Sequence, residues 1–172
     1  QDAESKGLYV AYIEAQENRS LPSVLIPQIR SILLRISARE ALREKVARGL
    51  RILSGFAKAL KFKYQDIEVN LDFEPEKGIA DSGHFESDLT DLLSMIGETA
   101  KQDKTGLVIA IDELQNVSLP ELEALIRAFH HLSQNQLPVL FIGAGLPQIL
   151  GQMGDAKSYA ERLFEFIHID KL

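Results

Sequence analysis

Short runs of apolar, β-branched and aromatic residues recur along the chain, and each predicts a strand. They lie at residues 8–15, 107–111 and 138–144. The run at 107–111 reads Leu-Val-Ile-Ala-Ile and contains no polar residue, which is typical of a strand in a parallel sheet with both faces covered. The Ile-His-Ile triplet at residues 167–169 predicts a last strand.

Between these runs, apolar residues recur at every third or fourth position, and this spacing predicts helices. Two of the helices begin with a capping-box pattern, Ser37 with Glu40 and Ser118 with Glu121. Helices that alternate with short apolar strands predict an α/β fold, a three-layer, mostly parallel sheet with helices on both faces. The other expected helices lie at residues 25–36, 84–102 and 157–166, and residues 145–154 are expected to form a turn and a short helix.

One segment interrupts this alternation of helices and strands. From Ile67 to Phe73 apolar and polar residues alternate with a period of two, which predicts a strand, and residues 62–64 are expected to pair with it as a β-hairpin. We therefore predict a single domain over residues 1–172 that contains a helical and β-hairpin insertion at residues 36–83.

Composition excludes several classes of protein. The chain has no cysteine, which removes disulfides, thiolate metal sites and thiol nucleophiles and suits a reducing, cytoplasmic location. No apolar run approaches the ~20 residues that span a membrane, so no membrane partner is expected. No G-x-S-x-G motif supports acyl transfer. His130 and His131 are adjacent on a predicted helix and face different ways, which argues against a two-histidine metal site.

The net charge of −6 is unevenly distributed. Residues 28–63 contain ten Lys and Arg against two Glu, a net charge of +8, which leaves −14 for the rest of the chain. The plainer interpretation is a solvated helix face that includes a Glu44–Arg48 pair. The alternative is a basic stripe that binds phosphate groups, DNA or a protein partner, and its candidate residues are Arg35, Arg39 and Arg43.

Two adjacent carboxylates, Asp112 and Glu113, follow directly after the strand at 107–111. In open parallel sheets ligands bind at the carboxyl ends of the strands. Adjacent residues that leave a strand point in different directions, so one carboxylate can hold Mg²⁺ through a bound water while the other orients an attacking water. Several apolar residues followed by Asp-Glu form the Walker B pattern. The alternative is an acidic residue that only caps the following turn.

With its surroundings, this pattern resembles a known family. The segments GLVIAIDELQ, LPVLFIGAGLPQI and KSYAERLFEF, with a helix between the first two, resemble P-loop ATPases of the AAA+/STAND type, in particular the archaeal-ATPase and origin-recognition-like groups. The resemblance covers residues 106–166, and residues 8–15 match the strand that follows the P-loop helix. It implies a P-loop NTPase fold in which residues 106–170 run from the Walker B strand to the last strand.

The resemblance also implies roles for individual residues. Asp112 binds Mg²⁺ for ATP, and Glu113 polarises the hydrolytic water. Arg162 lies where related ATPases place an arginine that reaches the γ-phosphate on a neighbouring subunit, which implies a homo-oligomer. A surface arginine paired with Glu161 or Glu165 is the alternative for Arg162. Gln115 is a supporting candidate.

Two features depart from the family. The chain contains no Gly-Lys dipeptide, so the phosphate-binding loop G-x-x-x-x-G-K-[ST] is absent. Gly143, Ala144 and Gly145 stand where a polar residue senses the γ-phosphate. In the family a first strand, P-loop and helix would precede Gln1, so we expect a fragment that lacks its first strand and is inactive alone. The competing hypothesis is a non-catalytic module that binds a protein partner or DNA through the basic stripe and the hairpin.

Overall fold

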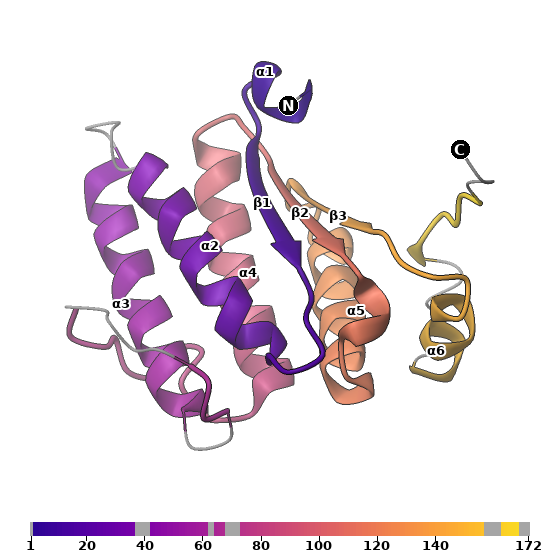
Figure 1. The fold of residues 1–172 in the computed structure, drawn as a ribbon. Coiled ribbons are helices and arrows are strands. Elements are labelled where there is room, and N and C mark those ends of the chain that lie inside the picture. The colour runs from indigo at the N-terminus through magenta and orange to yellow at the C-terminus, as the bar shows by residue number, and fades with distance from the viewer. Residues whose placement is uncertain (1, 37–41, 62–63, 68–72, 157–162, 169–172) are drawn as a thin grey trace.

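The computed structural model describes residues 2–36, 42–61, 64–67, 73–156 and 163–168. Within them, the chain alternates strands with helices as the apolar pattern predicts (Figure 1). The elements are α1 (Asp2–Ser5), β1 (Tyr9–Glu14), α2 (Leu21–Ile36), α3 (Arg43–Leu60), α4 (Phe85–Gln102), β2 (Leu107–Asp112), the 3₁₀ turn η2 (Leu114–Asn116), α5 (Leu119–Gln134), β3 (Val139–Gly143) and α6 (Ile149–Ala156).

The three strands form a parallel sheet in the order β1-β2-β3. β2 lies in the centre, and its register aligns Asp112 with Glu14 on one side and Ile111 with Gly143 on the other. The predicted α/β class, the three strands and their parallel arrangement are confirmed. Because all three strands run the same way, their carboxyl ends and the loops that follow them meet at one edge of the sheet.

The prediction of helices on both faces of the sheet is wrong for the described residues. On one face, alternate strand residues such as Ala11, Ile13 and Ile109 are almost fully buried beneath the helices. The opposite face is open, and Tyr12, Leu140 and Ile142 on it are 58%, 57% and 51% exposed. The sheet and its helices therefore form two layers.

The helices build the covered side of the sheet into one core. α2 packs on β1, α3 packs on α2 and α4, and α4 lies along α5 (Figure 1). The apolar stripes predicted from the sequence provide these contacts, for example Leu89, Leu92, Leu93 and Ile96 of α4, all buried. This packing fixes β2 and the residues at its carboxyl end.

Parts of the remaining predictions are corrected or lie outside the described residues. The hairpin at residues 62–73 falls mostly outside them, and its described residues, 64–67 and Phe73, are not in a strand. Ile167 and His168 are not in a strand either, so the last strand predicted at 167–169 is wrong where it can be checked. The Ser37–Glu40 capping box and most of the helix predicted at 157–166 lie outside the described residues.

Candidate functional site at the carboxyl edge of the sheet

Three loops are tied together at the carboxyl edge of the sheet. The side-chain amide of Asn116 donates to the carbonyl of Ala15 after β1 at 3.0 Å. The N–H of Leu114 donates to the carbonyl of Ala144 after β3 at 2.9 Å, and the N–H of Ala144 donates to Ile111 at 2.9 Å. The loop after β2 is therefore held between the loops after the two outer strands.

Asp112 lies at this edge on the open face of the sheet. Its Oδ2 accepts a hydrogen bond from the Tyr12 hydroxyl at 3.0 Å, and its Oδ1 accepts one from the N–H of Glu113 at 2.9 Å. The hydrogen bond to Asp112, together with the negative charge of that carboxylate, raises the pKa of Tyr12 above its ordinary value of 10.0. Tyr12 therefore keeps its proton and stays a hydrogen-bond donor to Asp112 at neutral pH.

Glu113 has a backbone conformation that non-glycine residues rarely adopt. Its φ and ψ are 53° and 40°, in the left-handed region, and its side chain is exposed. This conformation costs an L-residue roughly 1–2 kcal/mol relative to glycine. Backbone strain of this kind clusters at functional sites, although it also occurs in ordinary turns. Glu113 is thus held by its surroundings in a position that its own backbone disfavours.

This strain predicts that the difference in stability between a glycine and an alanine variant has opposite signs at Glu113 and at Glu98. We expect Glu113→Gly to be more stable than Glu113→Ala by about 1 kcal/mol, because only glycine tolerates positive φ without strain. At Glu98, an exposed residue inside α4, we expect Glu98→Gly to be less stable than Glu98→Ala by about 1 kcal/mol. Urea unfolding of the four variants measures both differences, and the same sign at both sites would contradict the strain at Glu113.

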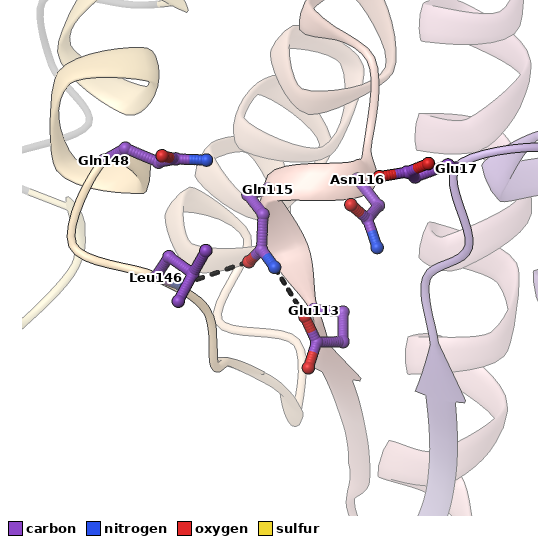
Figure 2. Close-up of a pocket in the computed structure, with 6 residues that line it drawn as sticks. All are labelled: Glu17, Glu113, Gln115, Asn116, Leu146 and Gln148. Carbon is purple, nitrogen blue, oxygen red and sulfur yellow. Dashed lines mark hydrogen bonds between the residues drawn. The ribbon is translucent and has the colours of Figure 1, made fainter. Parts of the chain in front are cut away.

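A cleft of about 500 Å³ opens beside Glu113 (Figure 2). The side chains of Gln115 and Glu113 point toward one another, and Gln115 also reaches the loop after β3. Polar groups dominate its lining, so the cleft suits a hydrated, charged ligand better than an apolar one. The residues that line it are Glu17, Glu113, Gln115, Asn116, Leu146 and Gln148.

A second cleft of about 360 Å³ lies along the start of α2, and two of the carboxylates that line it, Asp66 and Glu121, accept hydrogen bonds at helix starts. Burial alone would raise the pKa of Asp66, but the N–H and hydroxyl of Ser20 donate to it at 2.7 and 2.8 Å and bring the pKa below its ordinary value. Burial, followed by the charges of Glu121 and Asp66, raises the pKa of Tyr64 to about 12. The carboxylates of Asp66 and Glu121 are therefore engaged at the starts of α2 and α5.

The carboxylates at the edge can supply only part of a metal site. Within the described ranges, no group of three or more His, Asp or Glu side chains lies close enough to hold a metal ion. Mg²⁺ often takes one or two carboxylates from a protein and its remaining ligands from water and phosphate. Asp112, with Glu14 beside it in register on the same face, meets that smaller requirement.

Two glycines, Gly143 at the end of β3 and Gly145 just after it, have a packing role. A Cβ on Gly143 would lie 2.8 Å from Cδ2 of Leu114 and 3.1 Å from the Phe141 ring. A Cβ on Gly145 would lie 2.7 Å from Oε1 of Gln115. The space that a polar sensor side chain would need is already filled by η2, which gives a physical reason for this departure from the ATPase pattern.

The predicted site residues fall into three groups, of which Arg35 and Arg43, on α2 and α3, form the third. Asp112, Glu113 and Gln115 are brought together at the edge, whereas Arg162 and Arg39 lie outside the described residues. Tyr12, the hydrogen-bond partner of Asp112, was not among the predicted site residues, because it lies in the strand at residues 8–15 of a sheet that was expected to be covered on both faces.

The basic segment at residues 28–63, which contains the predicted stripe, is partly neutralised by Glu76. Arg35 lies over the ring of Tyr9 at 5.9 Å, and Arg43 is exposed at the start of α3. Arg48 forms an ion pair with Glu76 at 2.8 Å, in place of the predicted pair with Glu44, and Arg51 lies 3.7 Å from the same carboxylate. Glu76 therefore reduces the positive field of α3.

The comparisons with known proteins add no family. No protein-family model, curated protein or solved structure matches this chain. Among the helices of the described ranges, none has the length and apolar character needed to cross a membrane.

Proposed function

We propose that this chain carries the carboxylate half of an ATPase site of the P-loop AAA+/STAND type. The observation that supports this most directly is the placement of Asp112 and Glu113. They lie at the carboxyl end of the central strand, and Glu113 is held in a left-handed conformation beside a polar cleft. Bound Mg²⁺ would neutralise charge on the ATP phosphates during hydrolysis.

The two carboxylates have surroundings suited to different tasks. Asp112 is half-buried, and the Tyr12 hydroxyl and a backbone N–H orient it, which suits a fixed ligand for a hydrated cation. Glu113 is exposed at the cleft, and its carboxylate accepts a hydrogen bond from Gln115. This leaves Glu113 able to accept a proton from a water molecule in the cleft.

The phosphate-binding loop must come from polypeptide outside these 172 residues, because no Gly-Lys dipeptide occurs within them. Among the described residues, the outer edge of β3 pairs with no further strand. Pro138 and Ala144 bond to β2, so the alternation along the strand turns the N–H and C=O groups of Phe141 and Gly143 outward. Within the described residues these groups have no backbone partner, which supports the proposal that another strand adds there.

A Mg·ATP titration by calorimetry tests the proposed function. It compares the 172-residue chain with the chain extended upstream through the expected strand, loop and helix. We expect only the extended chain to bind, and we expect Asp112→Ala to weaken its Mg²⁺-dependent binding at least about tenfold, the typical effect of losing a metal-site group. Asp91→Ala, which removes an exposed carboxylate from α4, is the matched control and should leave binding unchanged.

Two outcomes would overturn the proposal: no binding by either chain, or binding by the extended chain that Asp112→Ala and Asp91→Ala affect equally.

The second candidate function is a module that binds DNA or a protein partner through the basic stripe. The exposed Arg43 favours it, and the Arg48–Glu76 ion pair disfavours it. Duplex DNA binding that weakens with salt and with Arg43→Glu would support this second function.

A further inference from the structure

Gln115 connects the two sides of the cleft through one side chain. Its Nε2 donates a hydrogen bond to Oε2 of Glu113, and its Oε1 accepts one from the N–H of Leu146 at 3.1 Å (Figure 2). A carboxylate can only accept and a backbone N–H can only donate, so these two partners fix the orientation of the amide. The flipped amide would lose both bonds.

The loop after β3 is shaped around this amide. A Cβ on Gly145 would lie 2.7 Å from Oε1 of Gln115 and 3.3 Å from the N–H nitrogen of Leu114. Gly145 has no positive φ, so an alanine there would meet no backbone strain and would act only through this crowding. The glycine thus leaves the space in which the Gln115 carbonyl reaches Leu146.

The carboxylate of Glu113 depends on Gln115 for its position. Among the described residues it accepts no other hydrogen bond, and its exposed side chain has several rotatable bonds. The backbone strain at Glu113 fixes where the side chain begins and leaves the carboxylate end free to turn. The hydrogen bond from Gln115 therefore decides where that carboxylate points.

We propose that Gln115 is a positioning residue that couples Glu113 to the loop between β3 and α6. The planar amide of Gln115 forms both hydrogen bonds. Loss of the Glu113 carboxylate therefore weakens the bond to the N–H of Leu146, and a change in the loop weakens the bond to Glu113. The role of this coupling in hydrolysis rests on the proposed function. In that role, the position of the Glu113 carboxylate affects the conformation of residues 144–148. By linkage, the effect is the same in both directions.

The coupling can be measured in the ligand-free chain by amide-proton exchange at Leu146. We expect Glu113→Ala to raise the exchange rate about fivefold, the change that corresponds to one lost hydrogen bond. In a Gln115→Leu background the same substitution should change nothing further. Glu17→Ala, which removes another exposed carboxylate from the same cleft, is the matched control and should leave Leu146 unaffected.

A second pair of variants tests the coupling with Gln115 intact. Gly145→Ala displaces the amide and should raise Leu146 exchange, whereas Gly151→Ala, where nothing lies within 4 Å of the added Cβ, should not.

In the extended chain, Gln115→Leu should lower kcat for ATP hydrolysis at least tenfold and change KM less than about threefold, because it misplaces a water-orienting group without removing a binding group.

The outcomes separate this inference from the proposed function. If Glu113→Ala raises Leu146 exchange equally with and without Gln115, or leaves it unchanged in both backgrounds, the coupling is wrong. A kcat unaffected by Gln115→Leu would overturn the positioning role. Failure of the extended chain to bind Mg·ATP would instead overturn the proposed function, and the ligand-free exchange measurements would still decide whether Gln115 couples the two sides.

Discussion

Replacement of Glu121 by alanine is expected to lower the free energy of unfolding by about 3 kcal/mol. The side chain is only 4% exposed. Its Oε2 accepts hydrogen bonds from the N–H and hydroxyl of Ser118, and its Oε1 accepts one from the N–H of Leu21 at 2.9 Å. Alanine removes the acceptor of the buried N–H of Leu21 at the start of α2 and of the N–H and hydroxyl of Ser118 at the start of α5.

Two controls separate this effect from a general effect of losing a carboxylate. Glu98→Ala removes an exposed glutamate from α4 and should change the unfolding free energy by less than about 0.5 kcal/mol. Glu121→Gln retains one acceptor oxygen and should fall between the wild type and Glu121→Ala. Urea unfolding with an unchanged m-value measures all three. A loss below about 1 kcal/mol for Glu121→Ala would mean that water replaces the carboxylate at both helix starts.

Replacement of Asp88 by alanine is expected to lower the free energy of unfolding by about 3–4 kcal/mol. Asp88 is 1% exposed and accepts three hydrogen bonds from the turn before α4. They come from the N–H of Ser82 at 3.1 Å, its hydroxyl at 2.7 Å and the N–H of Gly83 at 2.8 Å. Removal of the carboxylate takes the acceptor away from all three donors, and the Ser82 hydroxyl keeps only its contact with the Ser87 hydroxyl at 3.4 Å.

Asp91 offers a matched comparison for Asp88, because it lies on the exposed side of the same helix. We expect Asp91→Ala to stay within about 0.5 kcal/mol of the wild type in the same urea titration. Equal losses at the two positions would contradict the structural role of Asp88 and would indicate that the charge near the start of α4, common to both, is what stabilises the helix.

These four carboxylates, Asp88, Glu121, Asp112 and Glu113, separate into structural and available groups. The first two are buried, and every donor around them is part of a helix start. The last two lie at the carboxyl edge with an exposed or half-buried side chain. The sequence predicted the capping role of Glu121 and the strand-end position of Asp112 and Glu113, but it gave no role for Asp88, whose burial shows that it is structural.

Much of the fold was predictable because local pattern determines it. The apolar runs located all three strands, and the capping box located the start of α5 at Ser118. The contact of Glu121 with Leu21 was not predictable, because the two residues lie on different helices and no local spacing relates them. A capping pattern shows what a side chain does for its own helix, and tertiary structure decides what else it reaches.

The error about the open face has a physical cause. A run of apolar residues places apolar side chains on both faces of a strand. The sequence pattern does not show whether helices cover each of those faces. Leu140 and Ile142 of β3 are apolar and yet more than half exposed. The central β2 is shielded on this face by its two neighbours, as the 5% exposure of Val108 shows, so its apolar run gave the same signal as a doubly covered strand.

The candidate site was predictable in outline and not in detail. The rule that ligands bind at the carboxyl ends of parallel strands placed Asp112 and Glu113 correctly at one edge. The left-handed backbone of Glu113 and the two hydrogen bonds of Gln115 depend on how η2 packs against the loop after β3. That packing involves residues about 30 positions apart, beyond the reach of a local motif.

The edge position of β1 also has a consequence for the order in which the chain folds. β1 pairs with β2 across about 100 residues and β2 with β3 across about 30, so ring closure opposes the first pairing more strongly by roughly 1 kcal/mol. We expect α4, β2, α5 and β3 to assemble early and β1 to join late. Tyr12 belongs to β1, so Asp112 gains its hydroxyl partner only at the end of folding and loses it first when the edge strand detaches.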